Sequence, residues 1–275
     1  MRFEPLHAHD RDRNSIVVHQ VSVSYGDVVA LDDVSLDVAG GERVAVVGPN
    51  GSGKSTLFKV IAGVIQPQRG RVDLFGTEPR EHICVAYVPQ RSQVDWSFPV
   101  NVQDVVMMGR VGRLGLLRWP SRRDVALVRE CLEKVVAIEL SKRQIGELSG
   151  GQQQRVFIAR ALAQQAEVVL LDEPMTGLDV GSQTAIYGIL DTLRAMQVTV
   201  LLSTHDLNQA AQCFGRVLLL NRSVFGYGPA SQVLSSERLV AAYGDQLRLE
   251  EIGDGVLAFS DTACSGGGDG HVDHR

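Results

Sequence analysis

The chain has 275 residues, of which 44% are hydrophobic and 21% are charged, and its formal net charge at pH 7 is −5. This length and composition suit one ample globular domain or two small ones, and they exclude a disulfide-stapled miniprotein and a disordered chain. The acidic balance argues against a nucleic-acid-binding protein, whose domain would carry a clear basic excess. We therefore expect no nucleic-acid partner.

The cysteines and the apolar runs indicate the compartment. The four cysteines form no CxxC pair, so we expect reduced thiols, three of them in the core, and no metal or redox site among them. No apolar stretch reaches the ~18 residues that a membrane-spanning helix requires, and residues 1–13 lack the apolar centre of a signal peptide. These features predict a soluble protein that faces the cytoplasm.

Strand patterns dominate the first part of the chain. Residues 1–14 are polar and predict a flexible tail. Short apolar segments then predict a series of strands, at 16–18, 21–23, 34–38 and 43–47. The last of these is apolar along most of its length, which is typical of a strand buried on both faces of a parallel sheet. Three later runs have the same character, at 168–171, 198–202 and 217–220.

Helical spacing appears between these strands. Apolar residues recur at helical intervals on two segments, Leu57, Val60, Ile61 and Val64 on the first and Val125, Val128, Leu132 and Val135 on the second. Residues 91–164 show no buried-strand pattern and predict an inserted helical subdomain. Because strands and helices alternate elsewhere, we predict an α/β domain over residues 15–245 with a largely parallel sheet. Residues 246–275 form a C-terminal extension, which we expect to be disordered from about residue 260.

A glycine-rich loop follows the strand at 43–47. Residues 48–55 read Gly-Pro-Asn-Gly-Ser-Gly-Lys-Ser and match the phosphate-loop pattern G-x-x-x-x-G-K-[ST] in full. The glycines let backbone N–H groups point at phosphate oxygens, and the following helix adds the positive end of its dipole. Lys54 can place its charge between the β- and γ-phosphates, and Ser55 can bind Mg²⁺. The loop predicts a nucleotide site made of Gly48, Pro49, Asn50, Gly51, Ser52, Gly53, Lys54, Ser55 and Thr56.

Two acidic residues end the apolar run at 168–171. In open α/β sheets, ligands bind at the carboxyl ends of the strands, so Asp172 and Glu173 are expected beside the phosphate loop. We predict that Asp172 holds Mg²⁺ and that Glu173 polarises the water that attacks the γ-phosphate.

The segment Leu148-Ser149-Gly150-Gly151-Gln152 precedes a predicted helix at 153–164. Here the sequence resembles the ATP-binding subunits of ABC transporters, over essentially the whole span from residue 15 to about 245. The resemblance implies a P-loop NTPase (RecA-like) core with an N-terminal antiparallel β subdomain. It also implies a homodimer that closes around two ATP molecules, in which Ser149 and the backbone around Gly151 meet the nucleotide of the partner chain.

The resemblance assigns roles to four further residues. It implies that Tyr25 stacks on the adenine, that Gln90 contacts Mg²⁺ and the attacking water, and that His205 contacts the γ-phosphate. Asp179, in Gly177-Leu178-Asp179, belongs to a loop that aligns the opposite site. Since no catalytic position is substituted, we predict an ATPase with two identical sites, with Glu173, His205 and Gln90 as its catalytic residues.

The segment at 88–110 resembles the manganese, zinc and iron importers of this superfamily. The resemblance implies import energised through membrane permease subunits and, indirectly, a substrate-binding protein, with this chain on the cytoplasmic face of the membrane. The alternatives are a soluble ATPase of the cofactor-assembly type and an importer subunit for a ferric chelate. Trp96, Phe98 and Pro99 are either core residues or a groove for a short permease helix.

Histidines in both tails invite a metal-binding interpretation. His271, Asp273 and His274 have spacing that fits no defined coordination geometry. We interpret them, with His7 and His9, as solvated tail residues.

Overall fold

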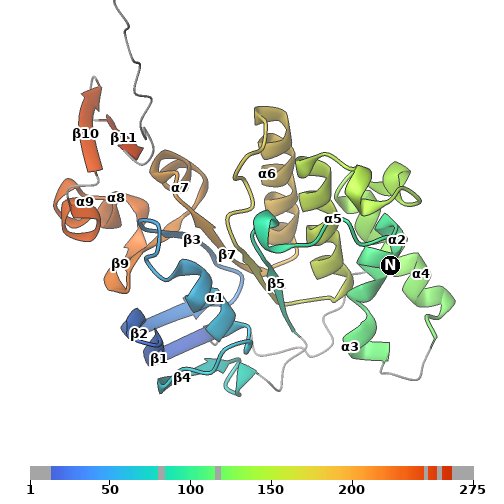
Figure 1. The fold of residues 1–275 in the computed structure, drawn as a ribbon, viewed down its shortest axis with the longest axis horizontal. Helices are drawn as coiled ribbons and strands as arrows, with labels where there is room; N and C mark the ends of the chain where they lie inside the picture. Colours follow the sequence, from blue (N-terminus) through green and yellow to red (C-terminus); the bar gives the residue numbers. More distant parts are fainter. Residues whose placement is uncertain (1–13, 80–83, 115–118, 245–246, 253–255, 262–275) are drawn as a thin grey trace, which may run out of the picture.

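The chain folds around two large β-sheets. The computed structural model describes residues 14–79, 84–114, 119–244, 247–252 and 256–261 (Figure 1). An antiparallel sheet has the order β2-β1-β4, with β1 at Asn14–Tyr25, β2 at Val28–Ala39 and β4 at Arg69–Leu74.

The central sheet has six strands in the order β5-β6-β7-β3-β8-β9. Its strands are β3 (Arg43–Val47), β5 (Val85–Val88), β6 (Val168–Leu171), β7 (Thr199–Thr204), β8 (Arg216–Asn221) and β9 (Ser223–Pro229). All neighbouring pairs from β5 to β8 are parallel, and only β9 pairs in the antiparallel direction. The predicted α/β fold with a mostly parallel sheet and an N-terminal antiparallel sheet is confirmed.

Alternate residues of the central strands face two separate cores. In β3, Ala45 and Val47 pack into the core that contains the long helices α5 (Gly150–Ala163) and α6 (Val180–Ala195). Val44 and Val46 pack into the core formed by α1 (Lys54–Ile61) and the antiparallel sheet. Because successive side chains of a strand point to opposite faces, a strand covered on both sides is apolar throughout.

The antiparallel sheet is longer than the sequence pattern predicts. The strands predicted at 16–18 and 21–23 are one strand, β1, with a register shift between Val18 and Val21, where Gln20 adopts φ 50°. The segment predicted at 34–38 is the second half of β2. The pattern misses β4, because only Val72 and Leu74 of its residues are buried.

Helix α1 spans Lys54–Ile61 and is shorter than predicted. Leu57, Val60 and Ile61 are buried. Val64 lies beyond the helix and 63% of its surface is exposed, because Gly63 adopts a left-handed φ of 70° that ends the helical spiral. The assignment of Val64 to the buried face was wrong.

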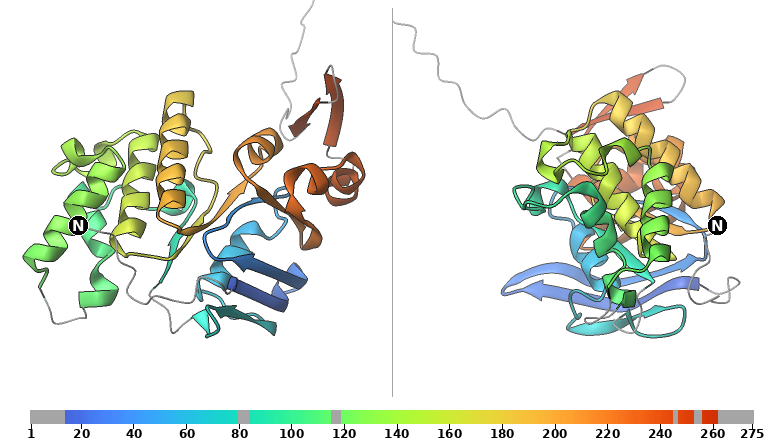
Figure 2. Two further views of the ribbon diagram at one scale, coloured as in Figure 1. Left: turned by 180° about the vertical axis from the view of Figure 1, so that it is seen from behind. Right: turned by 90° about the vertical axis from the view of Figure 1, so that its right-hand side faces the viewer.

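Between residues 91 and 163 the described part of the chain is built from helices. They are η2 (Arg91–Gln93), α2 (Val102–Met108), α3 (Val111–Leu114), α4 (Arg122–Lys134), η3 (Ile138–Leu140), η4 (Ile145–Glu147) and α5. Helices α2 to α5 lie at the right-hand end of the molecule in Figure 1 and at the left-hand end in the left view of Figure 2, away from the antiparallel strands. On α4, Val128 and Leu132 are buried as predicted, but Val125 is 44% exposed. The prediction was wrong for Val125.

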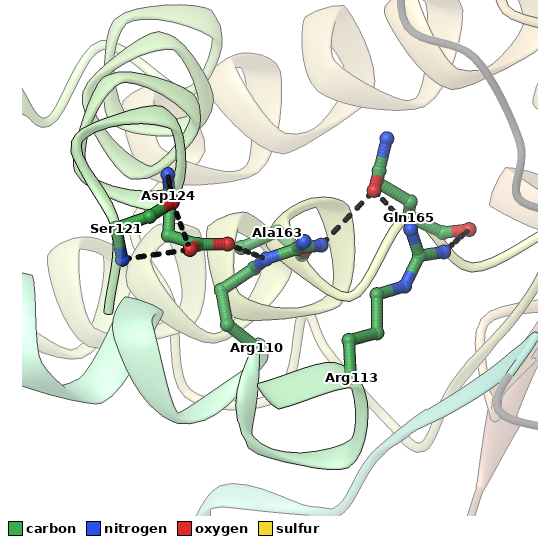
Figure 3. A network of polar contacts seen from close by, with 6 residues as sticks. All are labelled: Arg110, Arg113, Ser121, Asp124, Ala163 and Gln165. Carbon is green, nitrogen blue, oxygen red and sulfur yellow. Dashed lines mark hydrogen bonds and ion pairs between the residues drawn. The ribbon is translucent and has the colours of Figure 1, made fainter. Parts of the chain in front are cut away.

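A polar network joins the ends of three helices in this region (Figure 3). Arg110 donates from Nε to Asp124 Oδ1 at 3.0 Å and from Nη1 to the Ala163 carbonyl at 2.9 Å. Asp124 belongs to the capping box that starts α4, with Ser121 as the N-cap residue. Arg110 therefore connects the end of α2 with the start of α4 and the end of α5.

The remaining elements complete the other end of the molecule. They are α7 (Leu207–Cys213), α8 (Ala230–Val233), α9 (Ser236–Tyr243) and the hairpin of β10 (Leu247–Ile252) and β11 (Val256–Asp261). Residues 1–13 and 262–275, with all the tail histidines named above, lie outside the described residues.

The described helices are all too short or too polar to cross a bilayer. Three cysteines are free thiols, with Cys84 and Cys131 buried and Cys213 only half-buried, whereas three core thiols were expected. Burial raises the pKa of Cys84 and Cys131 to about 12, so neither thiol is reactive near neutral pH. The fourth, Cys264, lies outside the described residues.

Candidate active site

The glycine-rich loop joins β3 directly to α1. A Cβ atom at Gly53 would lie 2.4 Å from the Ala30 carbonyl oxygen, and one at Gly48 would lie 1.9 Å from the Leu220 oxygen. Gly53 also adopts a left-handed φ of 96° as the N-cap of α1. Glycine is required at both positions, because any side chain would collide with the neighbouring backbone.

Lys54 is held inside the loop. It is only 6% exposed, and its Nζ donates to the carbonyl oxygens of Gly48 at 2.7 Å and Pro49 at 3.0 Å. The loop is supported from the β8–β9 turn, where the Arg222 N–H donates to the Ser52 oxygen at 2.8 Å. These contacts place an ammonium group at the start of α1, where the helix dipole is also positive.

Asp172 lies at the carboxyl end of β6 and is 1% exposed. It accepts hydrogen bonds from Ser203 Oγ at 2.7 Å and from the Tyr87 hydroxyl at 3.1 Å. Burial and the Asp172 carboxylate raise the pKa of Tyr87 above its ordinary value, so this hydroxyl remains a hydrogen-bond donor. Sequence reasoning missed Ser203 and Tyr87, although both lie on strands adjacent to β6.

Glu173 follows in an unusual backbone conformation. Its φ is 46°, a left-handed value that a non-glycine residue adopts only where surrounding contacts support it. The Glu173 N–H donates to Ser203 Oγ at 2.8 Å. Ser203 therefore binds both acidic residues at once, one through its proton and the other through its oxygen.

The Glu173 side chain accepts hydrogen bonds from two other residues. Gln90 Nε2 lies 3.0 Å from Glu173 Oε2, and Thr176 Oγ1 lies 3.3 Å from the same oxygen. Gln90 and Glu173 lie 83 positions apart in the chain. They meet because β5 and β6 are adjacent parallel strands that end at the same edge of the sheet.

A cavity of about 820 Å³ opens between the loop and these side chains. This volume is in the range of small-molecule binding sites in proteins. Predicted site residues that line it are Tyr25, Asn50, Gly51, Ser52, Gly53, Lys54, Ser55, Thr56, Gln90, Glu173 and His205. Ala30 and Thr176 also line it and were not predicted. Tyr25 is 51% exposed.

The other predicted residues do not line this cavity. Gly48, Pro49 and Asp172 lie in the loop and the strand that support it. Ser149 and Asp179 are the N-cap residues of α5 and α6, where they accept hydrogen bonds from the N–H groups of Gln152 and Ser182. Hydrogen bonds from the Ser182 hydroxyl, at 2.7 Å, and from its N–H hold the pKa of Asp179 below its ordinary value.

The segment at 148–152 begins α5 earlier than predicted. The helix starts at Gly150, not at residue 153, and Ser149 and Gln152 form a reciprocal capping box. A Cβ atom at Gly151 would lie 2.2 Å from Ser182 Oγ. The first turns of α5 and α6 therefore pack directly against each other.

The aromatic residues after Gln90 differ in their surroundings. Trp96 packs on Phe157 of α5, with ring centroids 5.0 Å apart. Phe98 is 57% exposed. Trp96 is a packing residue, and Phe98 lies on the surface.

Known proteins can be aligned with more than four fifths of this chain. It is 47% identical to a manganese transport system ATP-binding protein, MntA, of Synechocystis, covering 84% of this chain and 91% of that protein. It is 46% identical to the Yersinia pestis chelated iron transport system membrane protein YfeB, over 86% of this chain and 81% of that protein. It is 44% identical to the Treponema pallidum zinc transport system ATP-binding protein TroB, over 85% of this chain and 88% of that protein.

A solved structure confirms the fold. A nucleotide-free ATP-binding cassette from an ABC transporter superposes with a TM-score of 0.74 at 27% identity, over 82% of this chain and 97% of that one. The phosphate loop, the acidic strand end and the cavity define a nucleotide-binding protein of the P-loop class. The family profile described as ABC transporter matches residues 31–176, and the chain belongs to the ABC transporter family.

Proposed function

We propose that this chain is the ATP-hydrolysing subunit that energises import of a divalent transition-metal ion, Mn, Zn or Fe, by a membrane ABC transporter. The observation that carries the enzymatic part is the meeting of Gln90, Glu173 and the complete phosphate loop at one cavity. In this arrangement the loop amides and Lys54 bind the phosphates, and the Glu173 carboxylate accepts the proton of the attacking water. Tyr25 stacks on the adenine, and His205 contacts the γ-phosphate.

The residues of the site fit a magnesium ion. Ser55, Gln90 and Asp172 offer hydroxyl, amide and carboxylate oxygens, which are the donors that Mg²⁺ prefers. Ser55 and Gln90 line the cavity, and Asp172 is a buried residue that immediately precedes Glu173, which also lines it. When bound, the ion supplies positive charge to the β- and γ-phosphates.

The site is completed by a second copy of the chain. Ser149, Gly150, Gly151, Gln152 and Asp179 lie at helix N-termini away from the cavity of their own chain. A helix N-terminus presents free N–H groups and a positive dipole end to an anion. In a head-to-tail homodimer, Ser149 and the backbone around Gly151 meet the γ-phosphate bound by the partner, and the loop that contains Asp179 crosses the interface and aligns the opposite site.

The cargo assignment rests on the relatives, whose names specify manganese, zinc and chelated iron. Within the described residues, no group of three or more His, Cys, Asp or Glu side chains is placed to hold a metal ion. In this proposal the metal is the cargo of the assembled transporter, and the chain binds permease subunits at the cytoplasmic face of the membrane. A substrate-binding protein delivers the cargo from the opposite side.

Reconstitution with the permease and the substrate-binding protein tests this function. We expect Mn²⁺, Zn²⁺ or Fe²⁺ to stimulate ATP hydrolysis by the complex and to leave hydrolysis by the isolated subunit unchanged. If only a ferric chelate stimulated hydrolysis, the cargo would be the chelate and not the free ion. Stimulation by a sugar or peptide, without a response to metals, would contradict metal import and leave the ATPase assignment standing.

A further inference from the structure

Gln90 and Arg91 are adjacent in sequence but bind different parts of the molecule. Gln90 contacts Glu173 at the cavity, as described above. Arg91 is the first residue of η2, and its Nε donates to Gln153 Oε1 at 2.8 Å. Two neighbouring side chains thus connect the catalytic carboxylate with helix α5.

Gln153 lies in the first turn of α5. It is 2% exposed, its N–H donates to the Ser149 carbonyl at 2.9 Å, and its Nε2 donates to the Ile145 carbonyl at 3.1 Å. A Cβ atom at Gly150 would lie 3.2 Å from the Arg91 guanidinium. Arg91 therefore contacts the helix turn that carries Ser149.

Trp96 holds Arg91 in this position. Its indole Nε1 donates to the Arg91 carbonyl at 2.9 Å, and the guanidinium lies 6.0 Å from the ring centroid. Trp96 also packs on Phe157, which lies one turn after Gln153 on α5. A cation beside the positive end of a helix dipole does not stabilise the helix by itself, so these directed contacts keep Arg91 in place.

We propose that Arg91 is a positioning residue that couples the two ATP sites of the homodimer. This inference rests on the proposed function, in which Gln90 acts at the site of its own chain and Ser149 at the site of the partner. A movement of Gln90 on ATP binding is transmitted through Arg91 and Gln153 to the N-terminal turn of α5. The occupancy of one site thereby changes the orientation of the Ser149 that serves the other site.

Arg91→Gln in the full chain tests the coupling, with Arg129→Gln as control because Arg129 forms an exposed ion pair with Glu133 on α4. We expect Arg91→Gln to bind a fluorescent ATP analogue as the wild type does. Its kcat falls by about tenfold, and the cooperativity of hydrolysis in ATP is lost, as removal of a moderate coupling free energy predicts. The control changes none of these quantities.

A double-mutant cycle separates coupling from loss of structure. In a Gln90→Ala background, Arg91→Gln should cause no further loss of kcat, because both residues act through one connection. Additive losses, an unchanged kcat, or equal losses of binding and turnover would each overturn the coupling. If Arg91→Gln does not fold, Arg91→Lys, which keeps the charge and a donor group, is compared with the wild type in the same assays. The proposed site is tested separately, since full turnover in Glu173→Gln would refute it whatever Arg91 does.

Discussion

At the scale of single residues, Ser203 determines how the two acidic residues of the site are presented. It donates to Asp172 and accepts the N–H of Glu173. The left-handed backbone at Glu173 then directs its side chain towards Gln90 and the cavity. One hydroxyl on β7 thus binds the carboxylate of Asp172 and the backbone N–H of Glu173.

Glu173→Gln should trap the nucleotide-bound dimer. The substitution removes the carboxylate that accepts the proton of water but leaves the contacts of the phosphate loop. We expect kcat to fall by about 10²-fold or more, with ATP binding retained, as measured by steady-state turnover and by dimer mass in Mg-ATP. Turnover at the wild-type rate would show that Glu173 is not the base.

At the scale of elements, the packing of α5 against α6 sets the geometry of the predicted in-trans site. Gly151→Ala should separate these helices, because the new methyl group would overlap Ser182. We expect ATP binding by the isolated subunit to persist while hydrolysis falls. Gly188→Ala is the matched control, since Gly188 lies inside α6 and a Cβ atom there would meet no atom of another segment within 4 Å. It should raise the free energy of unfolding by about 0.5–1 kcal/mol. Normal hydrolysis in Gly151→Ala would contradict the packing argument.

The ion pair of Arg110 and Asp124 stabilises the helical end of the molecule. Burial opposes ionisation of Asp124, but hydrogen bonds from Ser121 and the pair with Arg110 outweigh it and lower the pKa of Asp124. Arg110→Gln leaves a buried carboxylate without its cation, so we expect the free energy of unfolding at pH 7 to fall by about 3 kcal/mol. Arg129→Gln, which removes an exposed ion pair with Glu133, should lower the free energy of unfolding by only about 0.5 kcal/mol.

The pH dependence of this effect has a definite sign. Because the pKa of Asp124 is lowered in the folded chain, its contribution to stability is present above the ordinary aspartate pKa of about 4. The contribution is lost as the pH falls through the lowered value. The difference between wild type and Arg110→Gln in denaturant titrations should therefore shrink in acid. A difference that grows in acid would contradict this account.

At the scale of the whole molecule, we expect the proposed homodimer to depend on nucleotide. Each cavity lacks the residues at the N-termini of α5 and α6, and each chain carries a net charge of −5. Like charges oppose association, and ATP supplies much of the contact between the chains. We expect analytical ultracentrifugation of Glu173→Gln to show monomer without nucleotide and dimer with Mg-ATP. A tight dimer without nucleotide would count against the head-to-tail arrangement.

Several features of this protein are local, and the sequence by itself determined them. The phosphate loop depends on glycines at set positions between an apolar strand and a helix, so a short segment specifies its backbone. The apolar runs at β3, β6, β7 and β8 specify a parallel sheet, because only strands covered on both faces lack polar alternation. The position of Glu173 beside the loop follows from the same rule for strand ends.

Other features depend on contacts between distant segments, and only the tertiary structure decided them. The strand β4 and the exposure of Val125 follow from which surfaces meet, and not from the period of the local pattern. Ser203, Tyr87 and Thr176 carry no motif, and they join the site because β5, β6 and β7 end at one edge of the sheet. Hydrophobic periodicity reports what is buried, but a polar contact forms only where the fold brings a donor within reach of an acceptor.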